Sequence, residues 1–154
     1  SSVIPDYSGD ILITIQLGKV KIGFESQGDP NSRMINDDTI KKYKLGEHFG
    51  FNDPLTHKPT LRNPYYIGDD KVFPVPGLDG IKGLQDKGAV FCVCDMARKV
   101  NAQFIAQKMG LKTEIVYSDL VVGTHPGIKA APSGVWALGR LAENRIAYID
   151  ASVG

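Results

Sequence analysis

The chain has 154 residues, of which 42% are apolar and 23% charged, and this balance excludes a disordered or collagen-like chain. Eighteen basic and 17 acidic residues give a net charge of +1, and there is no basic block, so nucleic acid is not an expected partner. No apolar run reaches the roughly 20 residues of a membrane helix, so no membrane span is expected. The length favours a single domain over residues 1–154.

The first third of the chain predicts extended structure followed by one short helix. Residues 11–17 (ILITIQL) are aliphatic and β-branched, which is typical of a strand, and residues 20–24 (VKIGF) extend it or form a second one. A short helix capped by Asp37 or Asp38 should follow and end at Gly46.

Residues 47–78 are expected to form a loop rich in proline. This stretch holds Pro54, Pro59, Pro64, Pro74 and Pro76, and each proline removes a backbone donor and restricts the residue before it. A long helix or a central strand is therefore excluded. Long loops inside compact domains are often functional, and we expect an ordered surface loop that contacts another subunit or covers a pocket.

The second half of the chain predicts alternating helices and strands. The expected elements are a helix capped by Asp79 and running to about Lys87, a strand at 89–94, a helix at 96–109 capped by Asp95 and ended by Gly110, a short helix from Thr113 to Tyr117, a strand at 128–131, a helix at 134–144 capped by Ser133, and a strand at 146–150. Strands joined by helical crossovers indicate a three-layer α/β fold, with a mostly parallel sheet and helices on both faces.

Cys94 is the best candidate for chemistry. It ends the apolar run 89–94 (AVFCVC) and directly precedes a predicted helix, and open α/β sheets bind ligands beyond such strand ends. Free amides at Met96 and Arg98 and the helix dipole favour the thiolate, and hence a nucleophile or persulfide carrier. Two observations oppose this: Asp95 raises the thiol pKa unless its carboxylate is turned away, and free cysteines often only pack.

Other residues near this strand end have weaker claims. Arg98 could bind an anionic substrate or lie on an exposed helix face. Ser133 and Gly134, at the next strand-to-helix junction, either start a helix or contact an anion or sulfur species beside Cys94. Trp136 is interpreted as a core residue.

Cys92 lies two residues earlier in the same strand and is interpreted as a core residue. The Cα atoms of residues 92 and 94 of a strand lie about 6.6–6.8 Å apart, the outer limit for a disulfide, so two free thiols are favoured. Two thiolates alone do not close a zinc site, and the spacing of His48, His57 and His125 matches no metal motif. No metal or other cofactor is therefore expected, although a site built from the cysteines and a histidine stays an alternative.

Residues 81–150 resemble the DsrE/DsrF-like family, which includes the YchN-like and Tus-type sulfur-relay proteins. The resemblance rests on IKGLQDKGAVFCVCDMA, on the amphipathic helix that follows with its MGL and DL turns, and on IKAAPSGVWALGRLAENRIAYI. The stretch 38–64 is similar to an insert found in an exported subgroup. Family members open with a strand and a long helix, so the resemblance implies that this first unit is missing, rearranged or supplied by another chain.

The resemblance implies a doubly wound, flavodoxin-like α/β fold and a homo-oligomer (trimer or hexamer) or a hetero-oligomer with related subunits. In the sulfur-relay members the strand-end cysteine carries sulfur as a persulfide, and the matching residue here is Cys94. A sulfur-donor or sulfur-acceptor protein is then an expected partner. The subgroup favours the periplasm, and a cytoplasmic location stays open. The alternatives are a non-catalytic oligomeric binding module and the metal or cofactor site.

Overall fold

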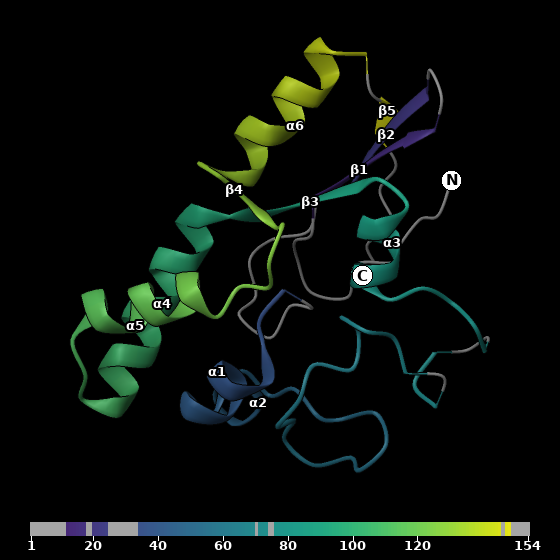
Figure 1. The fold of residues 1–154 in the computed structure, drawn as a ribbon. Helices are drawn as coiled ribbons and strands as arrows, with labels where there is room; N and C mark the ends of the chain where they lie inside the picture. Colours follow the sequence, from purple (N-terminus) through teal and green to yellow (C-terminus); the bar gives the residue numbers. More distant parts are fainter. Residues whose placement is uncertain are drawn as a thin grey trace.

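A five-stranded sheet organises the part of the chain that the structure describes. The structure is a computed structural model, and it describes residues 12–17, 20–24, 34–69, 71–73, 76–145 and 147–148. The strands lie in the order β4-β3-β1-β2-β5 (Figure 1). They are β1 (Leu12–Leu17), β2 (Val20–Phe24), β3 (Ala89–Cys94), β4 (Lys129–Ala131) and β5 (Ala147–Tyr148). No helix in these ranges is both long enough and apolar enough to cross a membrane.

The sheet is mixed, and the expectation of a mostly parallel sheet is wrong. β3 pairs in parallel with β4, and β2 with β5, but β1 is antiparallel to both of its neighbours, β2 and β3. The physical reason lies in the connections. β1 and β2 are joined by two residues, a length that allows only an antiparallel hairpin, whereas β3 and β4 are joined through helices.

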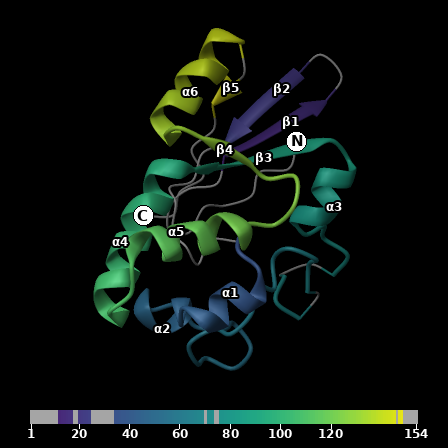
Figure 2. The ribbon, with the colours of Figure 1, turned by 60° about the vertical axis from the view of Figure 1, so that its left-hand side comes forward.

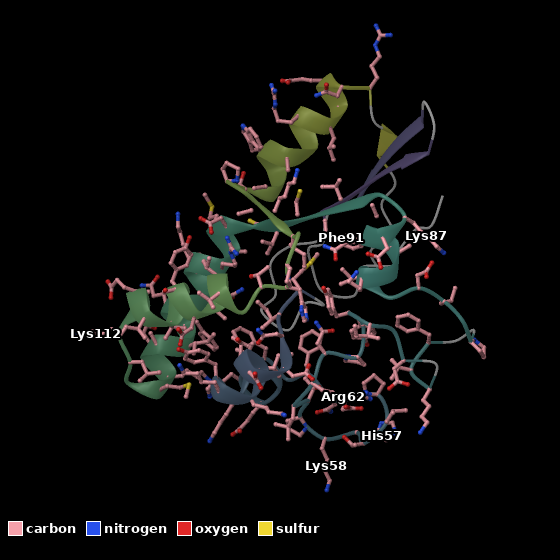
Figure 3. The ribbon with its side chains drawn as sticks, viewed as in Figure 1. His57, Lys58, Arg62, Lys87, Phe91 and Lys112 are labelled. Atoms are coloured by element: carbon pink, nitrogen blue, oxygen red, sulfur yellow. The ribbon has the colours of Figure 1, made fainter. Side chains whose placement is uncertain are left out.

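Helices cover β3 from both sides, so the chain has a mixed α/β fold. Phe91 packs with the helix α3 (Ile81–Asp86), whereas the neighbouring Cys92 packs against Ala137 of the helix α6 (Gly134–Glu143). Successive strand residues face opposite sides of a sheet, so these two helices lie on opposite faces of β3. Figure 2 shows α6 above β3 and β4, and α3 below β3. Figure 3 labels Phe91 on the α3 side of β3.

A second core joins four helices away from the sheet. The helices α4 (Asp95–Met109) and α5 (Thr113–Val122) lie side by side, next to α1 (Asp37–Lys42) and α2 (Leu45–His48) (Figures 1 and 2). Its buried members are Ile35, Ile40, Tyr43, Leu45, Ala102, Ile105, Ala106, Val116 and Leu120. Since α4 starts where β3 ends, this core fixes the direction of α4 at the strand end.

Three predicted helix caps are wrong, each because the expected aspartate has another partner. Asn36, not Asp37 or Asp38, caps α1, and Asp37 instead accepts a hydrogen bond from the backbone N–H of Asn63. Gly80 precedes α3, and Asp79 pairs with Lys87. Cys94, not Asp95, caps α4, which begins one residue earlier than expected. The short helix predicted up to Gly46 is two helices, α1 and α2.

Other boundaries agree with the expectations. Gly110 ends α4 in the left-handed region (φ 66°), which favours glycine, and Ser133 caps α6. β3 covers the predicted range. The helix α5 is longer than expected, because Leu120 continues beyond Tyr117 the buried face that Val116 begins. Of the last predicted strand, Ala147 and Tyr148 pair with β2, and its other residues lie outside the described ranges.

The proline-rich loop is ordered by polar contacts in its described parts. Asp53 is buried and pairs with Arg62, which also pairs with Asp69. In Figure 3, Arg62 points into the loop, whereas Lys58 points away from the protein. The backbone N–H of Ile81 donates to the carbonyl of Tyr65 at 3.0 Å, which joins the loop to α3. These contacts fix the described parts of the loop against one another and against α3.

Candidate functional site

The candidate site lies where β3 and β4 end side by side. The two strands are parallel, and their register places Cys94 opposite Ala131. α4 begins directly after Cys94, and α6 begins three residues after Ala131, so two helix N-termini start at the same edge of the sheet. This is the edge at which open α/β sheets bind ligands, because free backbone N–H groups converge there.

The thiol of Cys94 is held at the start of α4. Its backbone is extended (φ −71°, ψ 110°), and Sγ accepts a hydrogen bond from the backbone N–H of Ala97 at 3.4 Å. The sulfur therefore occupies the capping position at which a serine or aspartate oxygen is usual. Cys94 is a free cysteine and is half-buried. The sulfur thus faces a backbone donor at the positive end of the helix dipole.

Cys92 has a different environment, although it lies on the same face of β3. It packs against Ala131 and Ala137, and it is also a free cysteine. Burial raises the pKa of the Cys92 thiol, and the nearby Lys129 offsets this only in part. Cys92 is half-buried, and its packing agrees with the prediction of a core residue.

The carboxylate of Asp95 is held by donors from two helices. It accepts hydrogen bonds from Tyr117 Oη at 2.8 Å and Arg98 Nη2 at 2.7 Å, and Lys99 Nζ lies 3.0 Å away. Burial alone would raise the pKa of Asp95, but these three donors outweigh it and hold the pKa below its ordinary value. Three donors therefore compensate the charge of the Asp95 carboxylate, and this carboxylate does not cap α4.

Arg98 is buried within this cluster, and the expectation of an exposed helix face is wrong for it. Its side chain is 9% exposed, because Nη2 pairs with Asp95 and Nη1 donates to Thr124 Oγ1 at 3.3 Å. Its Nε is buried without a hydrogen-bond partner. Arg98 thus contributes a fixed positive charge near the start of α4, while two of its nitrogens are already in use.

The remaining predicted site residues line the two helix starts. Met96 is 60% exposed on the first turn of α4. Ser133 Oγ accepts a hydrogen bond from the backbone N–H of Trp136 at 3.1 Å, so its hydroxyl caps α6, and Gly134 is the first residue of that helix. Trp136, interpreted from the sequence as core, is 52% exposed. Among the hydrogen bonds of the described residues, none joins Ser133 to the sulfur of Cys94.

The histidines do not join the cysteines in a metal site among the described residues. No group of three or more His, Cys, Asp or Glu side chains in these ranges could hold a metal ion. His125 instead stacks on Tyr66, with ring centroids 3.5 Å apart and an interplanar angle of 2°. Burial lowers the pKa of His125.

Comparison with known proteins leaves the site to be judged on this geometry. No family model, curated protein or solved structure matches the chain.

Sequence reasoning missed three residues of the site, which are Lys99, Tyr117 and Thr124. Tyr117 and Thr124 hold Asp95 and Arg98 from 22 and 26 residues further along the chain. No spacing rule relates residues so far apart, because their contacts depend on how α5 packs against α4. The presence of an aspartate directly after Cys94 could have indicated that other residues must hold its carboxylate.

Proposed function

We propose that the chain is a sulfur carrier in which the Cys94 thiolate accepts a sulfane sulfur and passes it to a partner thiol. The observation that carries the proposal is the capping contact, which places Sγ of Cys94 against the backbone N–H of Ala97 at the end of a strand. Chemistry of this kind needs a half-exposed thiol that ionises readily, and Cys92 is disfavoured because burial raises its pKa.

The transfer step needs only the thiolate and a sulfur donor. The lone pair of the Cys94 thiolate attacks the terminal sulfur of a donor persulfide, a new S–S bond forms, and the donor leaves as a thiolate. With thiosulfate as the donor, sulfite leaves instead. The Cys94 persulfide then gives its outer sulfur to a partner thiolate by the same exchange, which regenerates the Cys94 thiolate.

The charges around Cys94 support this step. Arg98 and Lys99 outnumber the single carboxylate of Asp95, and Lys129 lies on the neighbouring strand β4. Sulfane donors and the persulfide product are anions, which the basic residues at this end of the sheet would attract.

We also propose the finer fold and assembly that accompany this function. The packing of α3 and α6 on opposite faces of β3 supports a three-layer, DsrE-like arrangement. The family resemblance of residues 81–150 supports a trimer, a hexamer or a hetero-oligomer with related subunits, and a sulfur-donor or sulfur-acceptor protein as partner.

Intact-protein and peptide mass spectrometry test the proposal. After treatment with polysulfide or thiosulfate, the peptide with Cys94 should gain about 32 Da, the mass of one sulfur atom added as a persulfide. The Cys92→Ser variant should gain the same mass, and Cys94→Ser should not. Cys94→Ser keeps an oxygen at the capping position, so its fold should survive. An adduct on Cys92 alone, or none in the folded wild type, contradicts the proposal.

A second candidate, a binding module without catalysis, is favoured by one specific observation. Met96, Val100 and Phe104 are exposed on α4 and recur every four residues, so they form one apolar stripe on the helix. In this reading Cys94 serves only as the cap of α4. Native alkylation separates the two functions, because a thiol that only caps and packs reacts slowly with iodoacetamide until the protein unfolds.

A further inference from the structure

The sulfur-transfer step does not explain why an aspartate directly follows Cys94 or why its carboxylate has several donors. A carboxylate one residue after a nucleophilic thiol opposes ionisation of that thiol. The residue is nevertheless an aspartate, and its carboxylate has three donors, from Tyr117 on α5 and from Arg98 and Lys99 on α4.

The thiol and the carboxylate leave the chain on opposite sides. Cys94 continues the face of β3 on which Cys92 packs against α6. The side chain of Asp95 reaches Tyr117 of α5, the helix that packs against α4 in the second core. Figure 2 shows α5 and α6 on different sides of β3 and β4. The negative charge is thus held on the side of the sheet away from the sulfur.

We propose that Tyr117 is a positioning residue for Cys94, because its hydroxyl ties the Asp95 carboxylate to α5 and so keeps this charge away from the thiolate. Arg98 and Lys99 belong to the same turn as Asp95 and move with it, whereas Tyr117 belongs to another helix. Arg98 adds to the tether through Thr124 Oγ1. A role for Tyr117 in sulfur transfer rests on the proposed function of Cys94.

The other charged groups near the thiol do not replace this tether. Lys129 on β4 acts electrostatically on Cys92 and lies one strand away. On α6, the described charged residues Arg140 and Glu143 pair with each other at 2.7 Å. Asp95 is therefore the carboxylate that adjoins Cys94 in the chain, and the hydrogen bond from Tyr117 limits where this carboxylate can lie.

The test is the pH dependence of Cys94 alkylation in the Tyr117→Phe variant. Alkylation by iodoacetamide is followed on the Cys94 peptide between about pH 5 and 10, since its rate follows the thiolate fraction. At an effective dielectric constant of about 20, two like charges several ångströms apart that move about 2 Å closer lower the thiolate fraction by about threefold. We therefore expect about threefold slower alkylation near neutral pH and a profile displaced towards higher pH.

Tyr43→Phe is the matched control. Tyr43 donates its hydroxyl to Asp119 of α5, so this variant removes a tyrosine–aspartate hydrogen bond from the same helical core, away from the thiol. Its alkylation profile should equal that of the wild type. The double variant Tyr117→Phe with Asp95→Asn should lose the displacement, because the uncompensated charge is gone. An unchanged profile for Tyr117→Phe, or the same displacement in Tyr43→Phe, overturns the proposal.

Sulfur uptake, measured by mass on the same variants, keeps the two proposals distinguishable. A displaced profile for Tyr117→Phe together with no sulfur adduct on wild-type Cys94 supports the tether and contradicts the sulfur carrier. An adduct on Cys94 with an unchanged profile supports the carrier and contradicts the tether.

Discussion

The ion pair between Asp53 and Arg62 gives a quantitative prediction for the proline-rich loop. Arg62 Nε lies 2.5 Å from Asp53 Oδ2, and Arg62 Nη2 lies 3.2 Å from Oδ1, so the contact is bidentate. The backbone N–H of Leu55 also donates to Oδ1 at 2.8 Å. The hydrogen bonds from Arg62, more than that from Leu55, lower the pKa of Asp53 from 3.8 to about 2 although burial opposes this.

The change Asp53→Asn removes the charge that these donors stabilise. A fall in pKa from 3.8 to about 2 corresponds to roughly 2.5 kcal/mol. Arg62 is 32% exposed, so solvent screens part of this energy, and we expect the variant to lose about 2 kcal/mol at pH 7. Because the folded-state pKa of Asp53 is depressed, this stabilisation is present above pH 3.8 and is lost as the pH falls towards about 2.

Urea unfolding of wild type and Asp53→Asn at a series of pH values measures this. The difference in free energy of unfolding should be constant from about pH 7 to about pH 5 and should narrow below about pH 4. Asp86→Asn is the control, since it removes an exposed i,i+4 ion pair with Lys82 and should change nothing measurable. A difference between wild type and Asp53→Asn that is absent at neutral pH, or that does not narrow in acid, refutes the reasoning.

Three further predictions concern other parts of the fold. Ser133→Ala should lower the free energy of unfolding by about 1 kcal/mol in urea, because the N–H of Trp136 loses its capping acceptor, and Ser133→Asp should restore it. Gly139→Ala on α6 should raise the melting temperature, since nothing lies within 4 Å of the added Cβ, whereas Gly46→Ala should lower it, since its Cβ would meet loop backbone at 2.4 Å. Because the pKa of His125 is lowered in the folded protein, the unfolded chain takes up this proton at a higher pH, and the free energy of unfolding should fall as the pH drops below 6.5. The His125→Gln variant should lose this pH dependence. An NMR titration midpoint of His125 at or above 6.5 contradicts the reasoning.

Much of the C-terminal half could be predicted from the sequence because its helix and strand boundaries are set by residues within one or two turns of each boundary. The strand at 89–94 is a continuous apolar run, Gly110 meets the need for a left-handed residue, and Ser133 caps within its own turn. These features depend on residues close by in the chain, so they can be recognised from the sequence alone.

The errors come from contacts between distant residues. Asp95 is a better cap than cysteine by intrinsic preference, but Tyr117 and Arg98 draw its carboxylate away, and Cys94 takes the position. The antiparallel partner of β3 is β1, which lies more than 70 residues earlier, so the helix–strand alternation of the C-terminal half could not reveal it. Cys94 could be singled out from the sequence as a candidate residue, whereas the cluster that surrounds Asp95 depends on helix packing.

The position of β3 limits how the chain can be divided. β3 takes one neighbour, β4, from later in the chain and the other, β1, from the beginning. A fragment that starts near Gly80 would contain residues 81–150 in full, yet one whole edge of β3 would keep unpaired donors and acceptors. Such a fragment should associate edge to edge in solution, and adding a peptide with the sequence of residues 11–24 should suppress this by restoring the missing hairpin. The hairpin of β1 and β2 therefore protects this edge of β3 from pairing with another molecule.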